Sequence, residues 1–526
     1  MFLACCIPLS DTDLFWHLKT GEWILEHSQV PYVDLYTFTN ADRPWIDLHW
    51  GFQVLIATVY RFGGSALLVT VKALVLAAVM WIGWWSAGRD LPAWLRGVPW
   101  MLALVTISGR GYERPEIFSL LFLAIWLWLM ERIDERPVLL WWLPALQMLW
   151  INMHALFVLG LVVGGCRAVD ELLRRVAGGR FGLMPATGTI TLRQAGYVAA
   201  LCALATLANP YFEEGALFPL VLYRKFNVEQ AFYSQHIGEF AQPIAMYRLF
   251  GFRNVYFDAE LLLWCIAALS FALLAASSRR WSPYRLLLFA AFSHLAWEAV
   301  RNTNIFSLVA AAVTAGNVND WWRRRPDAER VAPWVSRANW AAAAALSLFG
   351  VLTVTGHWHR AAGESKSFGF GERVAWYPHA AARFAGHPGL PRHAFASHFG
   401  VASVYTYHNG PERKVFMDGR LEVCSQRTFE QYNTILAQMA AGDSDWEAGL
   451  RDDDGRLPVV LLDSMQNSSR AAITGLYSRP QWRLVFADSS CAVFLETALA
   501  ERLGLSAVDY TPLIEPPGVK VRKEGR

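Results

Sequence analysis

Polar side chains of catalytic and anion-binding type recur in this sequence at the ends of apolar segments. Asp11 and Asp13 stand five and three residues before the Trp16-His17 pair, and Arg110, Glu113 and Arg114 share a short connection between two apolar stretches. The other residues of this kind are Trp16, His17, Glu116, Asn152, His154, Asn209, Arg301, Asn302 and Asn304. Charged groups at membrane depth are costly and usually face a cavity or a partner. The pattern therefore predicts a polar site at a membrane–water boundary.

These residue types point to the handling of a lipid-linked anion. Arginine gives permanently charged, bidentate contacts to phosphate. A carboxylate beside it can act as general base to an acceptor hydroxyl, and Asp11 or Asp13 is the best candidate for that role. Two carboxylates can instead hold a divalent metal that neutralises a phosphate leaving group, although the sequence contains no unambiguous metal motif.

Each candidate also has a structural interpretation. Asp11-Thr12-Asp13 can cap a helix over residues 14–27, because acidic side chains favour helix N-termini. Arginines near the ends of membrane helices often extend to lipid headgroups. His17, His49 and His154 can be packed, hydrogen-bonded histidines, and Glu239 is the weakest candidate because a solvated loop glutamate needs no explanation.

The composition indicates an integral membrane protein. Of the 526 residues 54% are hydrophobic and 17% are charged, whereas a soluble chain has about 25% charged residues. The 25 tryptophans fit interfacial anchoring belts. A net charge of +3 without a basic run argues against nucleic acid as a partner.

Apolar segments predict a transmembrane domain over residues 1–357, mainly α-helical, with about eleven helices. The predicted spans are residues 65–87, 97–109, 116–130, 138–152, 155–166, 195–208, 261–277, 286–300, 305–318 and 338–356. Residues 50–62 form one more apolar helix that ends at Gly63-Gly64, and residues 1–10 are shorter than a span, as expected for the end of a first helix whose start is missing.

Arginine placement predicts which ends of the spans face the cytoplasm. The connections 88–96, 131–137, 167–194, 278–285 and 319–337 each hold two to five arginines. They alternate with connections poorer in positive charge for their length, so the positive-inside rule places the first set in the cytoplasm. The long connections 10–64 and 209–260 then face outward, together with all the polar candidates above and everything after residue 357.

Residues 376–526 predict a small soluble α/β domain on the outer side. RLPVVLLDS indicates a buried strand, and WRLVFADSSCAVFLET indicates two strands around an Asp-Ser-Ser turn. TFEQYNTILAQMAAG is typical of an amphipathic helix closed by Gly442. Cys424 and Cys491 can pair in an oxidising compartment, or equally remain buried thiols.

With these residues in view, the chain resembles GT-C glycosyltransferases, polytopic enzymes that use polyprenyl-phosphate-linked sugars. The first outer loop carries the resemblance through its early acid, Gly21, Trp23 and Pro31. The chain is more closely similar to uncharacterised bacterial GT-C-like membrane proteins. The segments concerned are DTDLFWH, His49-Trp50, RPEIFSLLF from Arg114, LWINMH to His154, NPY from Asn209, RNTNIF from Arg301 and RKVFMDGRLEVC.

The resemblance implies inverting transfer of a sugar from a polyprenyl-phosphate carrier to a lipid, polysaccharide or protein acceptor on the outer face of a bacterial inner membrane. The catalytic acid carries over to Asp11 or Asp13, with Asp11 slightly favoured, and a second acid to Glu113 or Glu116. The substrate-binding residues are then His17, His49, Arg110, Arg114, Glu116, Asn152, His154, Arg301 and Asn302.

Two other functions fit part of the sequence. A transporter or flippase of a lipid-linked anionic glycan precursor explains the arginines equally well, but it does not require an early aspartate. A non-catalytic assembly protein with a GT-C-like fold would tolerate Asp11→Asn and Asp13→Asn together, because fold alone does not fix function.

Overall fold

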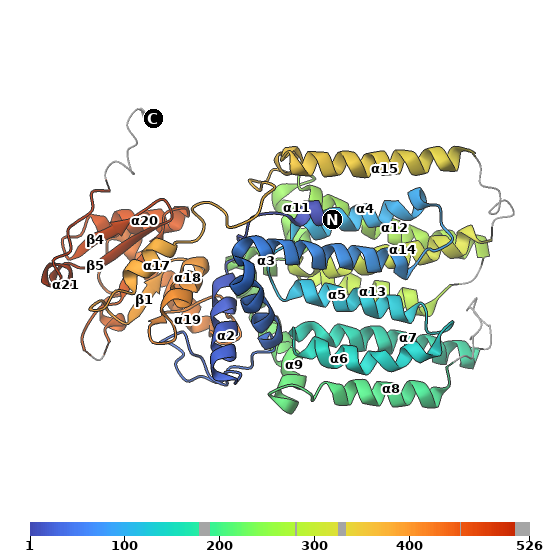
Figure 1. The fold of residues 1–526 in the computed structure, drawn as a ribbon, viewed down its shortest axis with the longest axis horizontal. Coiled ribbons are helices and arrows are strands. Elements are labelled where there is room, and N and C mark those ends of the chain that lie inside the picture. The colour runs from blue at the N-terminus through green and yellow to red at the C-terminus, as the bar shows by residue number, and fades with distance from the viewer. Residues whose placement is uncertain (178–189, 279–280, 325–332, 453, 511–526) are drawn as a thin grey trace. The chain divides into compact units, whose positions relative to one another are not determined.

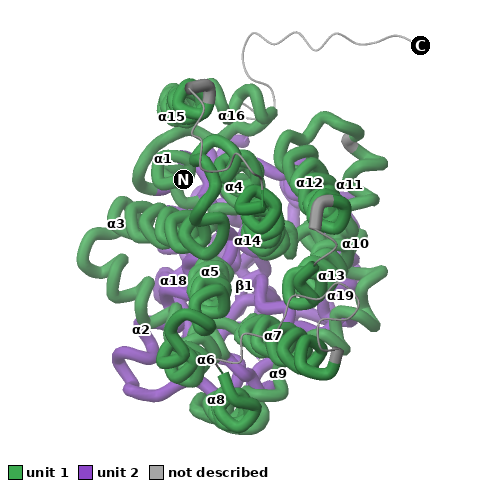
Figure 2. Tube along the Cα trace, turned by 90° about the vertical axis from the view of Figure 1, so that its right-hand side faces the viewer, with its two compact units in different colours: residues 1–9, 48–371 green, residues 10–47, 372–526 purple. Residues whose placement is uncertain are grey.

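The computed structural model describes residues 1–177, 190–278, 281–324, 333–452 and 454–510. The chain divides into two compact units (Figure 2). Unit 1 comprises residues 1–9 and 48–371, and unit 2 comprises residues 10–47 and 372–526. The predicted transmembrane domain included the whole connection 10–64, whereas residues 10–47 group by their contacts with the C-terminal residues.

Unit 1 is entirely helical in its described part. Its long helices run side by side as a bundle (Figure 1). The elements are α1 (Phe2–Cys5), α3 (Trp50–Ser86), α4 (Ala93–Gly109), α5 (Glu116–Met130), η1 (Pro137–Trp142), α6 (Leu143–Ile151), η2 (Ala155–Phe157), α7 (Val158–Ala177), α8 (Leu192–Ala205), α9 (Phe212–Val228), α10 (Gln230–His236), η4 (Gly238–Phe240), α11 (Pro243–Phe250), α12 (Val255–Ser278), α13 (Pro283–Glu298), η5 (Val300–Asn302), α14 (Thr303–Trp322), α15 (Pro333–Val354) and α16 (His357–Ala361).

Each of the ten predicted spans falls on helical residues of unit 1, although 138–152 is divided between η1 and α6, and 155–166 between η2 and α7. The predicted break at Gly63-Gly64 is also present, because α3 bends where Gly64 adopts φ 59°. Only glycine takes this conformation at low cost, so it marks the join between the 50–62 segment and the following span. Within the described residues, three helices are long and apolar enough to cross a membrane on their own: Trp50–Ser86, Val255–Ala276 and Val335–Val354.

The arginine-rich connections meet at one end of the bundle through ion pairs. Arg167 Nη2 lies 2.6 Å from Asp134 Oδ2, and Arg285 Nη1 lies 2.6 Å from Asp320 Oδ2. These contacts join α7 to the α5–α6 connection and α13 to the end of α14. The predicted grouping of these connections at one end is therefore visible in the contacts. Parts of the connections 167–194, 278–285 and 319–337 lie outside the described residues.

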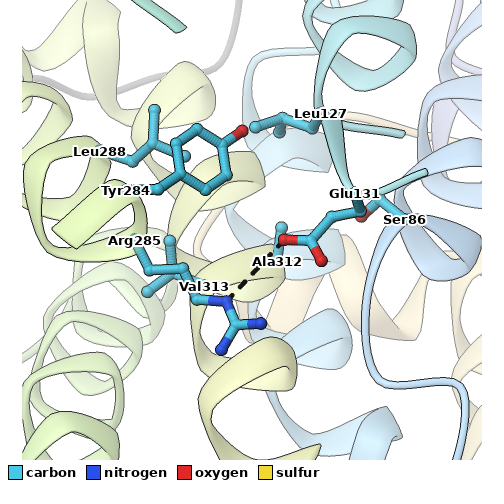
Figure 3. A pocket seen from close by; sticks show the side chains of 8 residues that line it. All are labelled: Ser86, Leu127, Glu131, Tyr284, Arg285, Leu288, Ala312 and Val313. Carbon is cyan, nitrogen blue, oxygen red and sulfur yellow. Dashed lines mark ion pairs between the residues drawn. The ribbon is translucent and has the colours of Figure 1, made fainter. Parts of the chain in front are cut away.

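A small cavity lies at this end, between α5, α13 and α14 (Figure 3). Its volume is about 10 Å³, which is room for one water molecule at most. Arg285 and Glu131 face each other across it, with Nε and Oε1 3.8 Å apart. A space of this size excludes a substrate, so the charged groups here join helices together.

Unit 2 is built on a five-stranded mixed sheet with the order β2-β1-β3-β5-β4. β1 pairs in parallel with β2 and β3, while β5 pairs antiparallel with β3 and β4. The elements are α2 (Leu14–His27), α17 (His379–Ala385), β1 (His393–Ala396), α18 (Phe399–Asn409), β2 (Lys414–Val415), α19 (Gln426–Ala441), η6 (Ala448–Leu450), β3 (Val459–Asp463), α20 (Asn467–Tyr477), β4 (Trp482–Ala487), β5 (Cys491–Glu496) and α21 (Thr497–Arg502).

The predicted α/β class of the C-terminal domain is confirmed. β3, β4 and β5 occupy the three predicted strand segments, and α19 ends at Gly442 in a left-handed conformation with φ 73°. Every residue of β3 is buried, as its continuous apolar run predicts. Cys424 and Cys491 are buried free thiols, so the alternative of a disulfide between them is wrong.

Residues 10–47 belong to unit 2 through both backbone and side-chain contacts. Phe38 N donates to Val415 O at 3.0 Å, and Trp16 N donates to Ser403 Oγ at 2.9 Å. Trp16, Tyr36 and Trp45 form one buried cluster with Val423. The first polar connection of the sequence therefore supplies core residues to the C-terminal domain.

Candidate functional site

Three connections of unit 1 contribute arginines and carboxylates to one cluster. It lies at the end of the bundle opposite the arginine-rich connections. α4 ends at Gly109, and Pro115 is the N-cap of α5, so the connection 110–115 is short. Pro115 cannot continue a preceding helix, because its ring restricts the residue before it. Arg110 and Arg114 are thereby held on the turn between two apolar helices. We call Arg110, Arg114, Glu116, Glu239 and Arg301 the arginine cluster.

Glu239 lies at the centre of the arginine cluster. Its two carboxylate oxygens each lie 2.8 Å from Arg114 Nη1, and Oε2 lies 3.3 Å from Arg110 Nη2. Burial alone would raise the pKa of Glu239, but the charges of Arg114, Arg110 and Arg301 outweigh it and lower the pKa to about 2. Glu239 is therefore ionised at neutral pH.

Arg301 completes the cluster from the connection between α13 and α14. Its guanidinium carbon lies 4.6 Å from the ring centre of Phe240, which is a cation–π distance. Burial lowers the pKa of Arg301, while the nearby carboxylates Glu239 and Glu116 raise it. Glu116 Oε2 lies 3.9 Å from Arg110 Nη2, and Asn304 Nδ2 donates to Glu116 Oε1 at 3.5 Å.

The cluster carries excess positive charge. Three arginines face two carboxylates, Glu116 and Glu239, so one positive charge is left over when both acids are ionised. Among the described residues Arg301 takes part in no ion pair. Planar guanidinium groups without a bound carboxylate are suited to phosphate oxygens. The cluster can therefore bind an anion.

A second group of predicted residues surrounds His154. His154 Nδ1 lies 2.7 Å from Ser119 Oγ, which also accepts a hydrogen bond from Trp150 Nε1 at 2.8 Å. The ring centre of His49 lies 5.4 Å from that of His154. Burial lowers the pKa of His154, and the charges of His49 and Arg301 lower it further, so His154 lies near the arginine cluster.

The side chains of Asn152 and Asn302 make hydrogen bonds within unit 1. Asn152 Nδ2 donates to Met148 O at 2.8 Å and to Ala208 O at 2.7 Å, and its Oδ1 accepts from Trp50 Nε1 at 2.9 Å. Asn302 Nδ2 donates to Leu295 O at 2.8 Å. These contacts fix the ends of α6 and α13 and favour positioning roles.

Asn152 also lines an open, mainly apolar groove of about 410 Å³ in unit 1. The groove runs along Trp50, Met148, Leu207, Asn209 and Phe212. Asn209 is held in a tight turn here, because its Nδ2 donates to Thr206 O and Phe212 O. The apolar lining suits a hydrocarbon chain.

Glu113 is paired with a lysine inside the bundle. Lys72 Nζ lies 2.5 Å from Glu113 Oε1 and donates to Ile7 O at 3.1 Å, and both side chains are 2% exposed. This pairing neutralises the carboxylate in a buried place. A lysine within the otherwise apolar segment 65–87 is the sequence signal that predicts such a partner.

Asp11, Asp13 and His17 lie in unit 2. Asp11 Oδ1 accepts from Asp13 N at 2.8 Å, and the Asp11 carbonyl accepts from Tyr377 Oη at 2.8 Å. Asp13 occupies the N-cap position of α2 without a side-chain capping bond, and its Oδ1 accepts from Trp16 Nε1 at 3.3 Å. His17 is buried, with its ring centre 3.6 Å from that of Trp16.

The structure thus corrects two interpretations of single residues. The interpretation of Asp13 as a side-chain helix cap is wrong, since its carboxylate makes no capping hydrogen bond. Glu239 is not a solvated loop glutamate but the central carboxylate of the arginine cluster. Sequence reasoning missed Glu239 because it lies over a hundred residues from Arg110 and Arg114, so only the fold brings them together.

The described residues contain no group of three or more His, Cys, Asp or Glu side chains that could hold a metal ion. A scan against protein-family models finds no match, and a search of curated proteins finds none either. Solved structures give a different result. The fold resembles that of an archaeal oligosaccharyltransferase.

Three structures of the Archaeoglobus fulgidus oligosaccharyltransferase AglB match this chain. The apo form matches with a TM-score of 0.54 and 12% identity over 89% of this chain and 68% of that chain. The complex with Zn and sulfate gives 0.53 and 12% over 87% and 64%. The complex with an inhibitory peptide and a dolichol-phosphate gives 0.54 and 10% over 94% and 71%.

At this identity the likeness concerns the fold, and it extends over both units. Together with the apolar helices, it makes the chain a multi-pass membrane protein with an AglB-like fold. The predicted fold class is confirmed, namely a helical membrane bundle followed by a small α/β domain.

Proposed function

We propose that this protein is a membrane glycosyltransferase that moves a sugar from a polyprenyl-phosphate carrier to an acceptor on the outer face of a bacterial inner membrane. The observation that carries the proposal is the arginine cluster at one end of an AglB-like bundle. AglB is solved with a dolichol-phosphate, which is a polyprenyl-type phosphate. An arginine cluster in the same kind of fold is suited to that headgroup.

In this proposal Arg110, Arg114 and Arg301 hold the carrier phosphate and stabilise the negative charge that it gains as the sugar leaves. Preorganised cations at a leaving group are among the strongest contributions to catalysis. His49 and His154 form the polar group next to these arginines. Asn152 and Asn302 hold the ends of α6 and α13. Glu116 sets the position of Arg110 through their contact at 3.9 Å.

Asp11 or Asp13 acts as the general base that takes the proton of the acceptor hydroxyl. Asp11 is buried, and its Oδ1 accepts a hydrogen bond from the backbone N–H of Asp13 at 2.8 Å, which fixes the direction of the carboxylate. The His17 ring packs against that of Trp16 beside this turn and helps to position it. The proposed steps use protein side chains alone.

The test is transfer of labelled sugar from polyprenyl-phosphate donors by purified protein in lipid nanodiscs. Arg114→Ala, Asp11→Asn and Asp13→Asn are compared with the wild type. We expect Arg114→Ala to weaken donor binding, and one of the two asparagine variants to lose turnover by about 100-fold or more, the range of a lost general base.

The matched controls carry the same changes away from the site. Arg483→Ala removes an arginine whose partner Glu501 is exposed, and Asp454→Asn changes an exposed aspartate of unit 2. Neither should change transfer. Donor binding without turnover in the wild type, together with movement of the carrier across the bilayer, would support the transporter alternative. Full turnover in the double variant Asp11→Asn/Asp13→Asn would refute the assigned base.

A further inference from the structure

The Glu239 carboxylate binds Arg114 and Arg110 through the same kind of charge-assisted contact that an oxyanion makes with arginine. Two of its contacts with Arg114 measure 2.8 Å, within the range of charge-assisted hydrogen bonds. The contact to Arg110 measures 3.3 Å. A carboxylate that binds two arginines in this way competes with any external anion for the same donors.

Some polar atoms in and beside the arginine cluster lack a hydrogen-bond partner even though Glu239 is bound there. Arg110 Nε and Asn304 Oδ1 are buried and have no hydrogen-bond partner within the described part of the chain. Buried polar groups normally find partners, so unmet ones at a charged site point to a ligand. Arg301 adds a third guanidinium, whose carbon lies 5.7 Å from the ring centre of Phe226 and 4.6 Å from that of Phe240.

The backbone that carries Glu239 is held by hydrogen bonds to a neighbouring connection, and its partly exposed side chain is bound by Arg110 and Arg114. Glu239 sits in the three-residue helix η4, between α10 and α11. Val300 N donates to Ala241 O at 2.9 Å, and Gln230 Nε2 donates to Glu298 O at 3.2 Å, so this segment is fastened to the connection that bears Arg301. The Glu239 side chain is 29% exposed and therefore has space to rotate toward solvent.

We propose that Glu239 is an internal anion that occupies the phosphate-binding arginines in the unloaded protein and is displaced when a phosphate enters. This inference rests on the proposed function, since it concerns the same cluster. The ligand class is a phosphate monoester or diphosphate, whether the headgroup of a prenyl carrier or a free phosphate. Glu239 then lowers the affinity for weak or solitary anions and leaves Arg110 and Arg114 paired when no donor is bound.

The experiment measures anion binding by the full chain in nanodiscs of zwitterionic lipid, by calorimetry, without any acceptor. The probes are a short-chain prenyl phosphate, inorganic pyrophosphate and inorganic phosphate. We expect Glu239→Gln to bind the prenyl phosphate at least about tenfold more tightly than the wild type, because a competing state is removed. Glu239→Asp, which shortens the side chain and keeps its charge, should give a smaller gain.

Two further variants control the measurement. Glu214→Gln removes an exposed acid in the first turn of α9, in the same long connection, and should leave affinity unchanged. Arg114→Ala should lose binding whatever stands at position 239. Tightening confined to the prenyl phosphate assigns the site to a lipid headgroup, and equal tightening for pyrophosphate assigns it to a free phosphate.

Unchanged or weaker anion binding in folded Glu239→Gln and Glu239→Asp, judged by their unfolding midpoints, would overturn the inference. Loss of sugar transfer in Glu239→Gln with unchanged affinity would overturn it as well, since Glu239 would then belong to the chemistry. The proposed function fails separately, when no donor supports transfer by the wild type even though anion binding tightens as expected.

Discussion

Arg420 and Asp34 form a fully buried ion pair across 386 residues of sequence, with Nη2 and Oδ1 2.6 Å apart. Asp418 supplies the second carboxylate, 2.7 Å from the same nitrogen. The aromatic rings of Tyr36 and Trp45 enclose the guanidinium at 4.9 and 4.5 Å. Burial lowers the pKa of Arg420, but the two aspartates outweigh it and raise the pKa above its usual value.

Arg420→Met should therefore destabilise unit 2 strongly. The substitution leaves Asp34 and Asp418 buried without a counter-charge, which typically costs about 3–5 kcal/mol. Unfolding of the full chain, followed by tryptophan fluorescence, and proteolysis within residues 10–47 measure the effect. Arg483→Met is the control, because its partner Glu501 is 61% exposed and solvent screens such a pair. Equal unfolding midpoints for both variants would contradict the expectation.

This pair also shows what the sequence can and cannot predict. Local periodicity locates the helices of unit 1 and the strands β3 to β5, because apolar residues recur along these segments in the pattern that each element buries. It does not reveal that the connection 10–47 belongs to the C-terminal domain. That grouping depends on Asp34, Trp16 and Tyr36 meeting Arg420, and contacts at such separation leave no local pattern.

The candidate site likewise has residues that the sequence predicts and one whose role it does not reveal. The positions of Arg110, Arg114 and Arg301 at one end of the bundle follow from the alternation of arginine-rich connections. The sequence ranked Glu239 as the weakest candidate, since a glutamate in a long polar connection is usually solvated. Its importance depends on the two arginines that the fold brings to it.

The Lys72–Glu113 pair permits a test of Glu113 as a catalytic acid. Lys72→Met removes the ion-pair partner of a buried carboxylate and should cost about 3–5 kcal/mol, while Lys72→Met/Glu113→Leu should recover most of that loss. Thermal unfolding in nanodiscs gives the stabilities, and sugar transfer is measured on the same samples. If Glu113 only neutralises Lys72, the double variant retains transfer. A stable double variant that is inactive would place Glu113 in the chemistry.

The stability of unit 2 should fall on mild acidification because of His408. Burial and the charges of His379, Arg383 and Lys19 lower the pKa of His408 to about 4, with Glu372 opposing them. An unfolded histidine has a pKa near about 6.5, so between these values the unfolded chain binds a proton that the folded chain does not. The contribution of neutral His408 to the stability of unit 2 is therefore fully present above about pH 6.5 and is lost as the pH falls toward 4.

The expected size is on the order of 1–3 kcal/mol between these pH values. His408→Gln should flatten the dependence of the unfolding midpoint on pH over this interval. His387→Gln changes an exposed histidine of the same unit and should leave the dependence as in the wild type. A wild-type midpoint that stays constant from pH 7 to 4.5 would exclude His408 as the cause of acid sensitivity.

Gly419→Ala tests the position of the Asp13 carboxylate without removing its charge. A Cβ at residue 419 would lie 2.1 Å from Asp13 Oδ1, so the carboxylate must move. A displacement of about 1 Å in a catalytic group can cost about 100-fold in rate. If Asp13 is the base, Gly419→Ala should lower transfer nearly as far as Asp13→Asn does, with donor affinity unchanged. Gly449→Ala, at a position with open space around it, is the matched control. Unimpaired transfer in Gly419→Ala and in Asp13→Asn would leave Asp11 as the remaining candidate.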